Sequence, residues 1–393
     1  MKFTNRESPI RNPQSAICNQ RRPGLYLHIP FCLTKCSYCS FYSQTDVSLI
    51  PDFLEALGKE MEMAGAGFSP PFDTVYIGGG TPSVLSARQI EKILAQIEKS
   101  FRLSRETEFT LEANPGDLDL AFLRSLKNLG INRLNLGVQS FDAQTLDFLG
   151  RRHTVEEAIK SVDASREAGF DAIGLDLIYG VPGQPLGLWQ DTLSRAVAFS
   201  PEHLSCYQLT LEDDTPLAES FRRDGFSLPG EDELLQFFLT TSEMLENSGF
   251  IHYEVSNFAR GLKYASRHNQ KYWDHTPYLG LGPAAHSFSE SRRWWNHRSV
   301  DGYINAIKAG RLPVEEMEML TVEERRLEAL FLGLRTKRGI HLKEFAEQYE
   351  YDLLAEKKEA LAKLQEEGLL SIQNGYAIPT RAGLALADSL ALI

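Results

Sequence analysis

The chain has 393 residues, a formal net charge of −12, and an ordinary globular composition with 42% hydrophobic and 24% charged residues. This length suits two or three domains, or one barrel with an appendage. The acidic balance argues against broad nucleic-acid binding, which needs a basic face. Because no apolar run reaches the roughly 20 residues that span a bilayer, we expect a cytoplasmic protein without an integral membrane segment. Peripheral membrane contact is left open.

The first 23 residues are predicted to be a flexible polar tail. Pro9, Pro13 and Pro23 interrupt any helix there, and the segment lacks the apolar stretch of a secretory signal. An amphipathic targeting role is the weaker alternative for the tail.

Residues 24–250 alternate short apolar runs with helix-like stretches, a pattern typical of parallel α/β folds. The predicted strands are Leu25–Ile29, Thr74–Ile77, Glu108–Glu112, Arg133–Val138, Ala172–Ile178 and Leu204–Leu209. The predicted helices are Pro51–Ala64, Ala87–Lys99, Leu118–Leu129, Val155–Ala168 and Leu188–Phe199. Six units are two short of a closed eightfold barrel, so we predict a partial (β/α)6 TIM-like barrel, with a doubly wound sheet as the alternative.

The remainder divides in two. Residues 251–314 are rich in His, Trp, Tyr and Asn and are predicted to be a linker region. Residues 315–393 carry three predicted helices and a hairpin, which indicate a small winged-helix-like α+β domain: Arg325–Leu334, Gly339–Tyr349, Leu353–Glu367, and the strand pair Leu369–Ile372 and Tyr376–Ile378. Because this domain has 10 basic against 15 acidic residues, a packing or partner role is favoured over DNA binding.

Cys32, Cys36 and Cys39 form a C-x3-C-x2-C motif directly after the first predicted strand. Three thiolates on one loop can surround one compact metal centre. Structural zinc usually takes four protein ligands, whereas a 4Fe–4S cluster held by three cysteines keeps one iron open. The spacing therefore favours an iron–sulfur cluster, with a zinc knuckle as the alternative. The other cysteines, Cys18 and Cys206, are isolated and are expected to be free thiols.

The cysteine motif, with Tyr38 before its third cysteine, resembles the cluster motif of radical S-adenosylmethionine (SAM) proteins. Four stretches narrow the resemblance to the oxygen-independent coproporphyrinogen III oxidases and the related HemW heme chaperone family: Tyr26–Cys32, Gly78–Pro82, Glu112–Gly116 and Asp176–Gly180. It covers the chain from about Gly24 onward. The resemblance implies a 4Fe–4S cluster with SAM bound at its open iron.

The same resemblance implies which residues lie around SAM: Tyr26, Tyr38, Gly79, Gly80, Thr81, Glu112, Gln139, Arg151 and Asp176. Gly78–Gly80 would let the backbone approach a ligand closely, although an ordinary tight turn uses glycine too. Asp176 is an acid inside an apolar strand and needs polar partners, for which ribose hydroxyls are suitable. Structural alternatives are that Glu112 caps a turn, Gln139 bridges strands, and Arg151 pairs with a surface acid.

Two features distinguish the relatives. The oxidase motif usually continues with another cysteine two residues after the third, where this chain has Phe41. In addition, residues 268–273 match the H-N-x-x-Y-W motif associated with heme binding in the HemW family, which implies heme contacts from His268, Tyr272 and Trp273. His275, His286, His297 and the pair Trp294–Trp295 are further candidates for a second ligand or a pocket wall, and His286 is alternatively expected near the SAM site.

The resemblance thus implies a chaperone that delivers heme to acceptor proteins, which stay unidentified. One alternative is an oxygen-independent coproporphyrinogen III oxidase, and another is a radical SAM enzyme with a different substrate. Without the family motif, a histidine beside two aromatic residues is more often a structural group than a heme ligand. Whether the chain is an enzyme, and whether SAM is cleaved, are left open.

Overall fold

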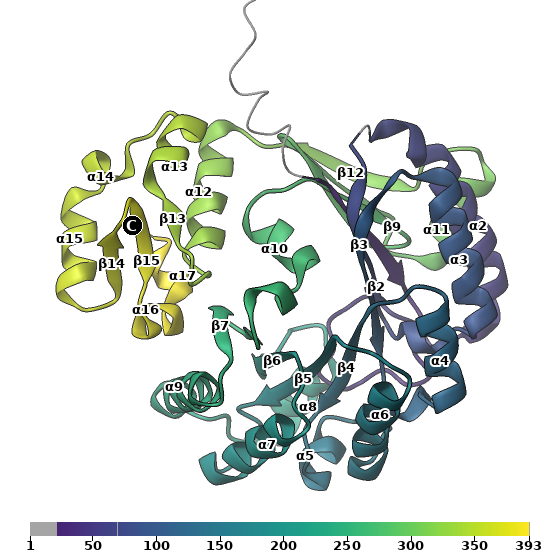
Figure 1. Ribbon diagram of the computed structural model, residues 1–393, viewed down its shortest axis with the longest axis horizontal. Helices are drawn as coiled ribbons and strands as arrows, with labels where there is room; N and C mark the ends of the chain where they lie inside the picture. Colours follow the sequence, from purple (N-terminus) through teal and green to yellow (C-terminus); the bar gives the residue numbers. More distant parts are fainter. Residues whose placement is uncertain (1–21, 69, 393) are drawn as a thin grey trace, which may run out of the picture.

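The computed structural model describes residues 22–68 and 70–392. A long curved sheet is covered by helices on its outer side and lies beside a smaller C-terminal domain (Figure 1). The predicted tail falls outside the described residues except for Arg22 and Pro23, and so does Cys18. The described part of the chain contains no helix long and apolar enough to cross a membrane.

The large sheet has twelve strands in the order β12-β11-β10-β9-β1-β2-β3-β4-β5-β6-β8-β7. Its parallel centre consists of β1 Gly24–Ile29, β2 Phe72–Gly79, β3 Leu103–Ala113, β4 Arg133–Gln139, β5 Ile173–Tyr179 and β6 His203–Gln208. Because the edge strands β12 and β7 do not pair with each other, the barrel is open. The predicted α/β fold with a partial barrel is confirmed.

Helices connect these strands on the outside. They are α2 Ile50–Ala64, α3 Ala87–Ser100, α4 Leu120–Asn128, α5 Ala143–Phe148, α6 Val155–Glu167, α7 Leu186–Ala198, α8 Pro216–Asp224 and α9 Glu231–Asn247. Capping boxes begin α3 at Ser86 and α6 at Thr154, where the hydroxyl and a glutamine or glutamate three residues later each bond a backbone N–H. These local signals explain why the predicted helix starts were accurate.

The parallel strands alternate between two environments. On β2, Val75 and Ile77 are fully buried in the core beneath the helices, where each contributes roughly 1.5–3 kcal/mol of hydrophobic stabilisation. Thr74 and Tyr76 point the opposite way, into the barrel, because successive side chains on a strand face opposite sides. The barrel interior is consequently lined by polar and aromatic side chains.

Residues 251–314 are more regular than predicted. They contain β7 Ile251–Glu254, β8 Asn257–Ala259, α10 Arg267–Trp273, β9 Tyr278–Leu281, β10 His286–Ser289, β11 Arg292–Asn296 and α11 Val300–Lys308, and β12 Val314–Met319 follows. β9 pairs parallel with β1, and β10 to β12 extend the same sheet, so this segment adds strands to the open barrel. The strands were missed because they are only three to five residues long.

The C-terminal domain has its own core and a separate three-stranded sheet. Its elements are α12 Val322–Gly333, β13 Ile340–His341, α13 Leu342–Tyr349, α14 Leu353–Glu356, α15 Lys358–Glu366, β14 Leu370–Gln373, β15 Tyr376–Pro379, α16 Arg381–Ala385 and α17 Ala387–Leu390. The predicted hairpin is confirmed, since Asn374 and Gly375 both have positive φ, at 51° and 79°. Two of the predicted helices differ from the structure. The predicted helix Gly339–Tyr349 begins as the short strand β13, and the predicted helix Leu353–Glu367 is broken at Lys357.

Candidate functional site

The cysteine loop lies at the carboxyl end of β1, where ligands of parallel sheets bind. Cys32 is buried, and Cys36 and Cys39 are half-buried. The Thr81 hydroxyl donates to the Cys32 sulfur at 3.3 Å, and the Arg151 guanidinium donates to the Cys36 sulfur at 3.1 Å. The fold thus brings cationic and hydroxyl donors from two other loops to the sulfurs, an arrangement that stabilises thiolates.

Within the described residues, no three cysteine, histidine or acidic side chains converge closely enough to hold one metal ion. Structural zinc usually takes four protein ligands, whereas the cysteine loop offers three thiols. A 4Fe–4S cluster takes each thiolate on a different iron, so its ligands are spread around a larger body. The donor set therefore fits an iron–sulfur cluster.

The glycine run at the end of β2 is fixed against the cysteine loop. The Gly80 and Thr81 amides donate to the carbonyls of Ile29 and Phe31, both at 2.8 Å. A Cβ on Gly80 would lie 2.8 Å from the Phe31 carbonyl oxygen, and one on Gly79, where φ is +109°, would lie 2.6 Å from the His28 ring. The chain's own packing therefore requires these glycines, a second reason for them beside close approach to a ligand.

Glu112 fixes the glycine loop from the neighbouring strand. Its carboxylate accepts hydrogen bonds from the Tyr76 hydroxyl at 2.7 Å and from the Gly79 amide at 3.2 Å. Burial raises the pKa of Glu112 to about 7 and that of nearby Asp176 to about 6. Asp176 accepts a hydrogen bond from Asn135 at 3.2 Å. Two carboxyl groups with raised pKa values at one end of a barrel are characteristic of a ligand site.

Gln139 and Arg151 lie side by side and carry buried polar atoms without partners. The Gln139 Oε1 and the Arg151 Nε have no hydrogen-bond partner among the described residues. Gln139 also has a φ of +63°, which is uncommon for a residue other than glycine. Orphaned buried atoms at a strained position indicate a site whose ligand supplies the missing bonds. Tyr38 lies against the same guanidinium, and burial raises the pKa of its phenol.

The predicted SAM residues thus gather around the carboxyl ends of the strands. Tyr26 lies deeper in the barrel, where its hydroxyl is 3.1 Å from His28 Nδ1. His28 and Tyr76 were missed at this site. The signal that could have found them is the period-two alternation of β1 and β2, because His28 shares a face with Tyr26, and Tyr76 shares one with Gly78.

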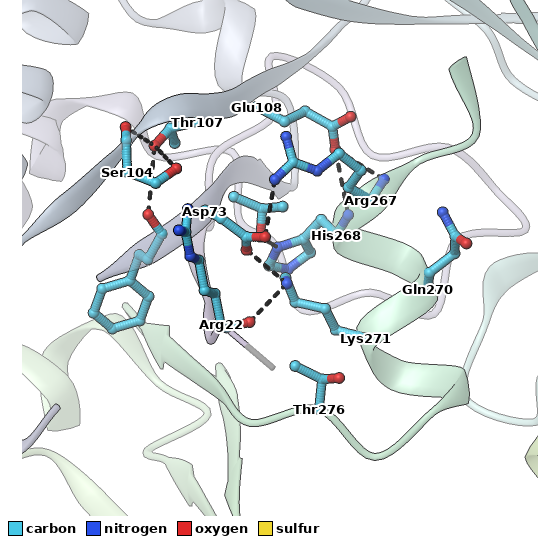
Figure 2. A network of polar contacts seen from close by, with 12 residues as sticks. Arg22, Asp73, Ser104, Thr107, Glu108, Arg267, His268, Gln270, Lys271 and Thr276 are labelled. Atoms are coloured by element: carbon cyan, nitrogen blue, oxygen red, sulfur yellow. Dashed lines mark hydrogen bonds and ion pairs between the residues drawn. The ribbon is translucent and has the colours of Figure 1, made fainter. Parts of the chain in front are cut away.

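The H-N-x-x-Y-W segment forms α10 at the opposite end of the barrel. Figure 2 shows how this helix is attached: Glu108 accepts from the backbone amides of Arg267 and His268, and Asp73 pairs with Arg267 at 2.9 Å and with Lys271 at 2.7 Å. Lys271 also donates to the Arg22 carbonyl at 2.8 Å. These contacts hold α10 against the amino ends of β1 to β3.

His268 is fully enclosed by the protein, with 1% of its surface exposed. Its Nδ1 lies 2.8 Å from the Thr74 hydroxyl and its Nε2 lies 2.9 Å from the Tyr272 hydroxyl. Burial lowers the pKa of His268 to about 3, so the imidazole is neutral. Ligation of heme iron by His268 stays a prediction that this conformation does not favour, because a ring nitrogen would have to give up its present partner.

His268 is also in contact with the barrel interior. Its ring centroid lies 5.2 Å from that of Tyr76, whose hydroxyl bonds Glu112. A continuous series of contacts therefore runs from α10 through Tyr76 and Glu112 to Gly79.

The other predicted heme candidates lie apart. Trp273 is half-buried and lines a crevice facing the C-terminal domain, together with His275. His286 is exposed at the start of β10 and stacks on Trp295 with ring centroids 5.4 Å apart. It lies beside Gly280 of β9, which pairs with Tyr26 of β1, and its expected position near the SAM site stays a prediction. His297 lies 3.7 Å from Glu315 at the base of β12. Cys206 is buried in β6, as expected for a free thiol.

Comparison with known proteins agrees with this geometry. Residues 26–196 match the radical SAM superfamily, and residues 320–386 match the HemN C-terminal domain. The heme chaperone HemW of Bacillus subtilis is 35% identical over 370 residues, which cover 93% of this chain and 97% of the relative. HemW of Mycobacterium tuberculosis H37Rv is 34% identical over 390 residues, 98% of each chain.

Among solved structures, the Escherichia coli coproporphyrinogen III oxidase HemN matches with a TM-score of 0.83 and 23% identity, covering 96% of this chain and 92% of that one. This likeness establishes the shared fold. The near-complete matches to the two chaperones establish more: the chain belongs to the HemW family of radical SAM proteins.

Proposed function

We propose that this protein is a cytoplasmic heme chaperone, which binds heme and transfers it to acceptor proteins on a scaffold that also holds a 4Fe–4S cluster and SAM. The observation that carries the proposal is the match to the Bacillus subtilis chaperone along 97% of that relative. Phe41 supports it, since this side chain occupies the place of the oxidase's additional cysteine and is 65% exposed. An exposed phenylalanine cannot supply a thiol to a cluster or a substrate.

In this proposal Cys32, Cys36 and Cys39 hold the cluster. The SAM site is formed by the residues gathered at the carboxyl ends of the strands, with Gln139 and Arg151 offering their unpartnered atoms. When bound here, a 4Fe–4S cluster and SAM would supply one-electron chemistry. The chain's own contribution is to fix the glycine loop through Glu112 and to place Arg151 on the Cys36 sulfur.

For the heme, the motif residues on α10 are the starting point. Tyr272 bonds His268, whereas Trp273 faces away from the barrel and has a buried indole N–H without a partner among the described residues. A free indole donor beside a crevice is better prepared for a ligand than an imidazole with both nitrogens bonded. We therefore propose Trp273 as the principal heme contact of the motif.

The test uses reconstituted, anaerobic protein in two parallel assays. With hemin, we expect one equivalent to bind and then to pass to an acceptor apoprotein, followed by the Soret band. With coproporphyrinogen III, SAM and a reductant, we expect no protoporphyrinogen IX. Turnover of coproporphyrinogen III without stoichiometric hemin binding would overturn the chaperone proposal in favour of an oxidase function.

A further inference from the structure

A crevice with a volume of about 440 Å³ lies between α10 and the C-terminal domain. Trp273 and His275 line it from the end of α10, and α12, β13 and α13 line it from the other side. Figure 1 shows α10 between the barrel strands and this domain. The volume lies within the range of about 300–1,000 Å³ that is typical of cofactor and small-molecule sites.

The helix α10 has two faces with different surroundings. His268 and Tyr272 are four residues apart and share the face that packs into the barrel. Trp273 is turned about 100° from Tyr272 around the helix and reaches the crevice. The crevice and the SAM residues are therefore on different sides of α10.

The walls of the crevice include apolar and aromatic side chains, and its rim carries an arginine. Phe345 and Ile340 are buried on the wall opposite Trp273. At the rim, Leu262 is 68% exposed and adds an apolar side chain to the crevice surface. Arg338 is exposed at the same rim. This combination is complementary to a flat apolar body that carries carboxylates at its edge.

Each of the two imidazoles of the crevice is hydrogen-bonded through its Nδ1 atom. His341 Nδ1 accepts the Glu344 amide at 3.2 Å and thereby caps α13. His275 Nδ1 lies 3.2 Å from the Tyr349 hydroxyl, and its Nε2 lies 3.5 Å from Glu328. The crevice thus offers surfaces for a ring and its carboxylates, with the two histidines held in place through their Nδ1 atoms.

We propose that this crevice binds the porphyrin macrocycle, with Trp273 and Leu262 against the ring and Arg338 beside the propionates. The proposal rests on the proposed function and adds to it the location of the heme and the feature that is recognised. Because recognition is through the ring and its carboxylates, metal-free protoporphyrin IX should bind nearly as tightly as hemin.

The test titrates hemin and protoporphyrin IX into the full chain and two variants, Leu262→Glu and Arg338→Glu. The matched controls are Leu312→Glu and Arg311→Glu, which change an exposed leucine and an exposed arginine outside the crevice. We expect both crevice variants to bind either porphyrin about tenfold more weakly, the controls to match the parent, and the melting temperatures of all five proteins to agree.

The outcomes separate the two proposals. If the parent binds one hemin but crevice variants and controls bind alike, the crevice is excluded and the chaperone proposal stands. If hemin binds and protoporphyrin IX does not, recognition is through iron and the crevice proposal is wrong. If the parent binds no porphyrin at all, the proposed function itself fails.

Discussion

At the carboxyl end of the strands, Gln139 Oε1 and Arg151 Nε are buried without partners among the described residues, whereas at the opposite end both ring nitrogens of His268 are bonded to protein groups. The residues at both ends match family motifs. At the first end the polar atoms lack bonds that a ligand can supply, and at the second the imidazole is already satisfied. A motif residue with complete internal bonding is thus better explained as a packing group than as a ligand.

The largest difference between the two ends is expected on removal of a thiolate. Cys36→Ser should abolish the iron–sulfur absorption of anaerobically reconstituted protein, because an alkoxide is a poor substitute for a soft thiolate. Iron and sulfide analysis measures the loss. Cys206→Ser is the matched control and should retain full iron, since Cys206 is buried in β6. Full iron content in Cys36→Ser would overturn the assignment of the cluster ligands.

At the α10 end of the barrel, substitutions are expected to lower the free energy of unfolding. His268→Ala removes a fully buried ring and leaves the Thr74 and Tyr272 hydroxyls unpaired, so we expect a loss of about 3 kcal/mol in the free energy of unfolding. Tyr272→Phe removes one hydrogen bond and should cost about 1 kcal/mol. Urea unfolding measures both. An unchanged midpoint in His268→Ala would show that the ring does not stabilise the barrel.

The bonds of Glu112 at the glycine loop predict a smaller, local effect. Glu112→Gln should weaken SAM binding about tenfold, because the amide cannot accept hydrogen bonds from both Tyr76 and Gly79 through two oxygens. Isothermal titration of SAM into cluster-loaded protein measures the change. Glu108→Gln, on the same strand at the α10 end, is the control and should leave SAM affinity unaltered. An equal loss of SAM affinity in both variants would contradict the proposal that Glu112 supports SAM binding through the glycine loop.

The effects of pH are expected to have opposite signs at the two ends. The folded-state pKa of Glu112 is raised to about 7, so its carboxyl stabilises the fold at low pH and this stabilisation is lost as pH rises from about 4.5 to about 7. The folded-state pKa of His268 is lowered to about 3, so the neutral ring stabilises the fold above about pH 6.5 and this stabilisation is lost as pH falls.

Urea unfolding of metal-free protein at about pH 5 and about pH 8 tests both signs. Compared with Glu112→Gln, the parent should gain stability towards pH 5. Compared with His268→Gln, it should lose stability over the same change. Differences that do not vary with pH would contradict the burial of these groups.

Much of the fold was predictable because its signals are local. Hydrophobic periodicity located the six parallel strands, and the capping boxes at Ser86 and Thr154 marked helix starts that the structure confirms. The helix after Thr321 begins at Val322, three residues before the predicted start. The strands between 251 and 296 were missed because they are short and obtain their stability from neighbours distant in sequence, as β9 does from β1.

The site was predictable to a different extent at each end. The cysteine spacing pointed to a cluster directly from the residues, and the residues that the family motifs imply for SAM lie at the carboxyl ends of the strands. The surroundings of His268 depend on Thr74, 194 residues earlier in the chain, which no local pattern reveals. The separation of Trp273 from His268 also required the structure, because it depends on what packs against each face of α10.

The central claim is that α10 separates two sites, with its His268 face supporting the barrel and its Trp273 face contacting heme. The most direct test measures hemin and SAM affinity in Trp273→Ala and His268→Gln. It uses cluster-loaded protein whose folding is verified by a thermal melt. We expect Trp273→Ala to bind hemin about tenfold more weakly with an unchanged Soret position and unchanged SAM affinity, and His268→Gln to keep hemin affinity while binding SAM more weakly. Loss of hemin binding in His268→Gln, with full binding in Trp273→Ala, would contradict the claim.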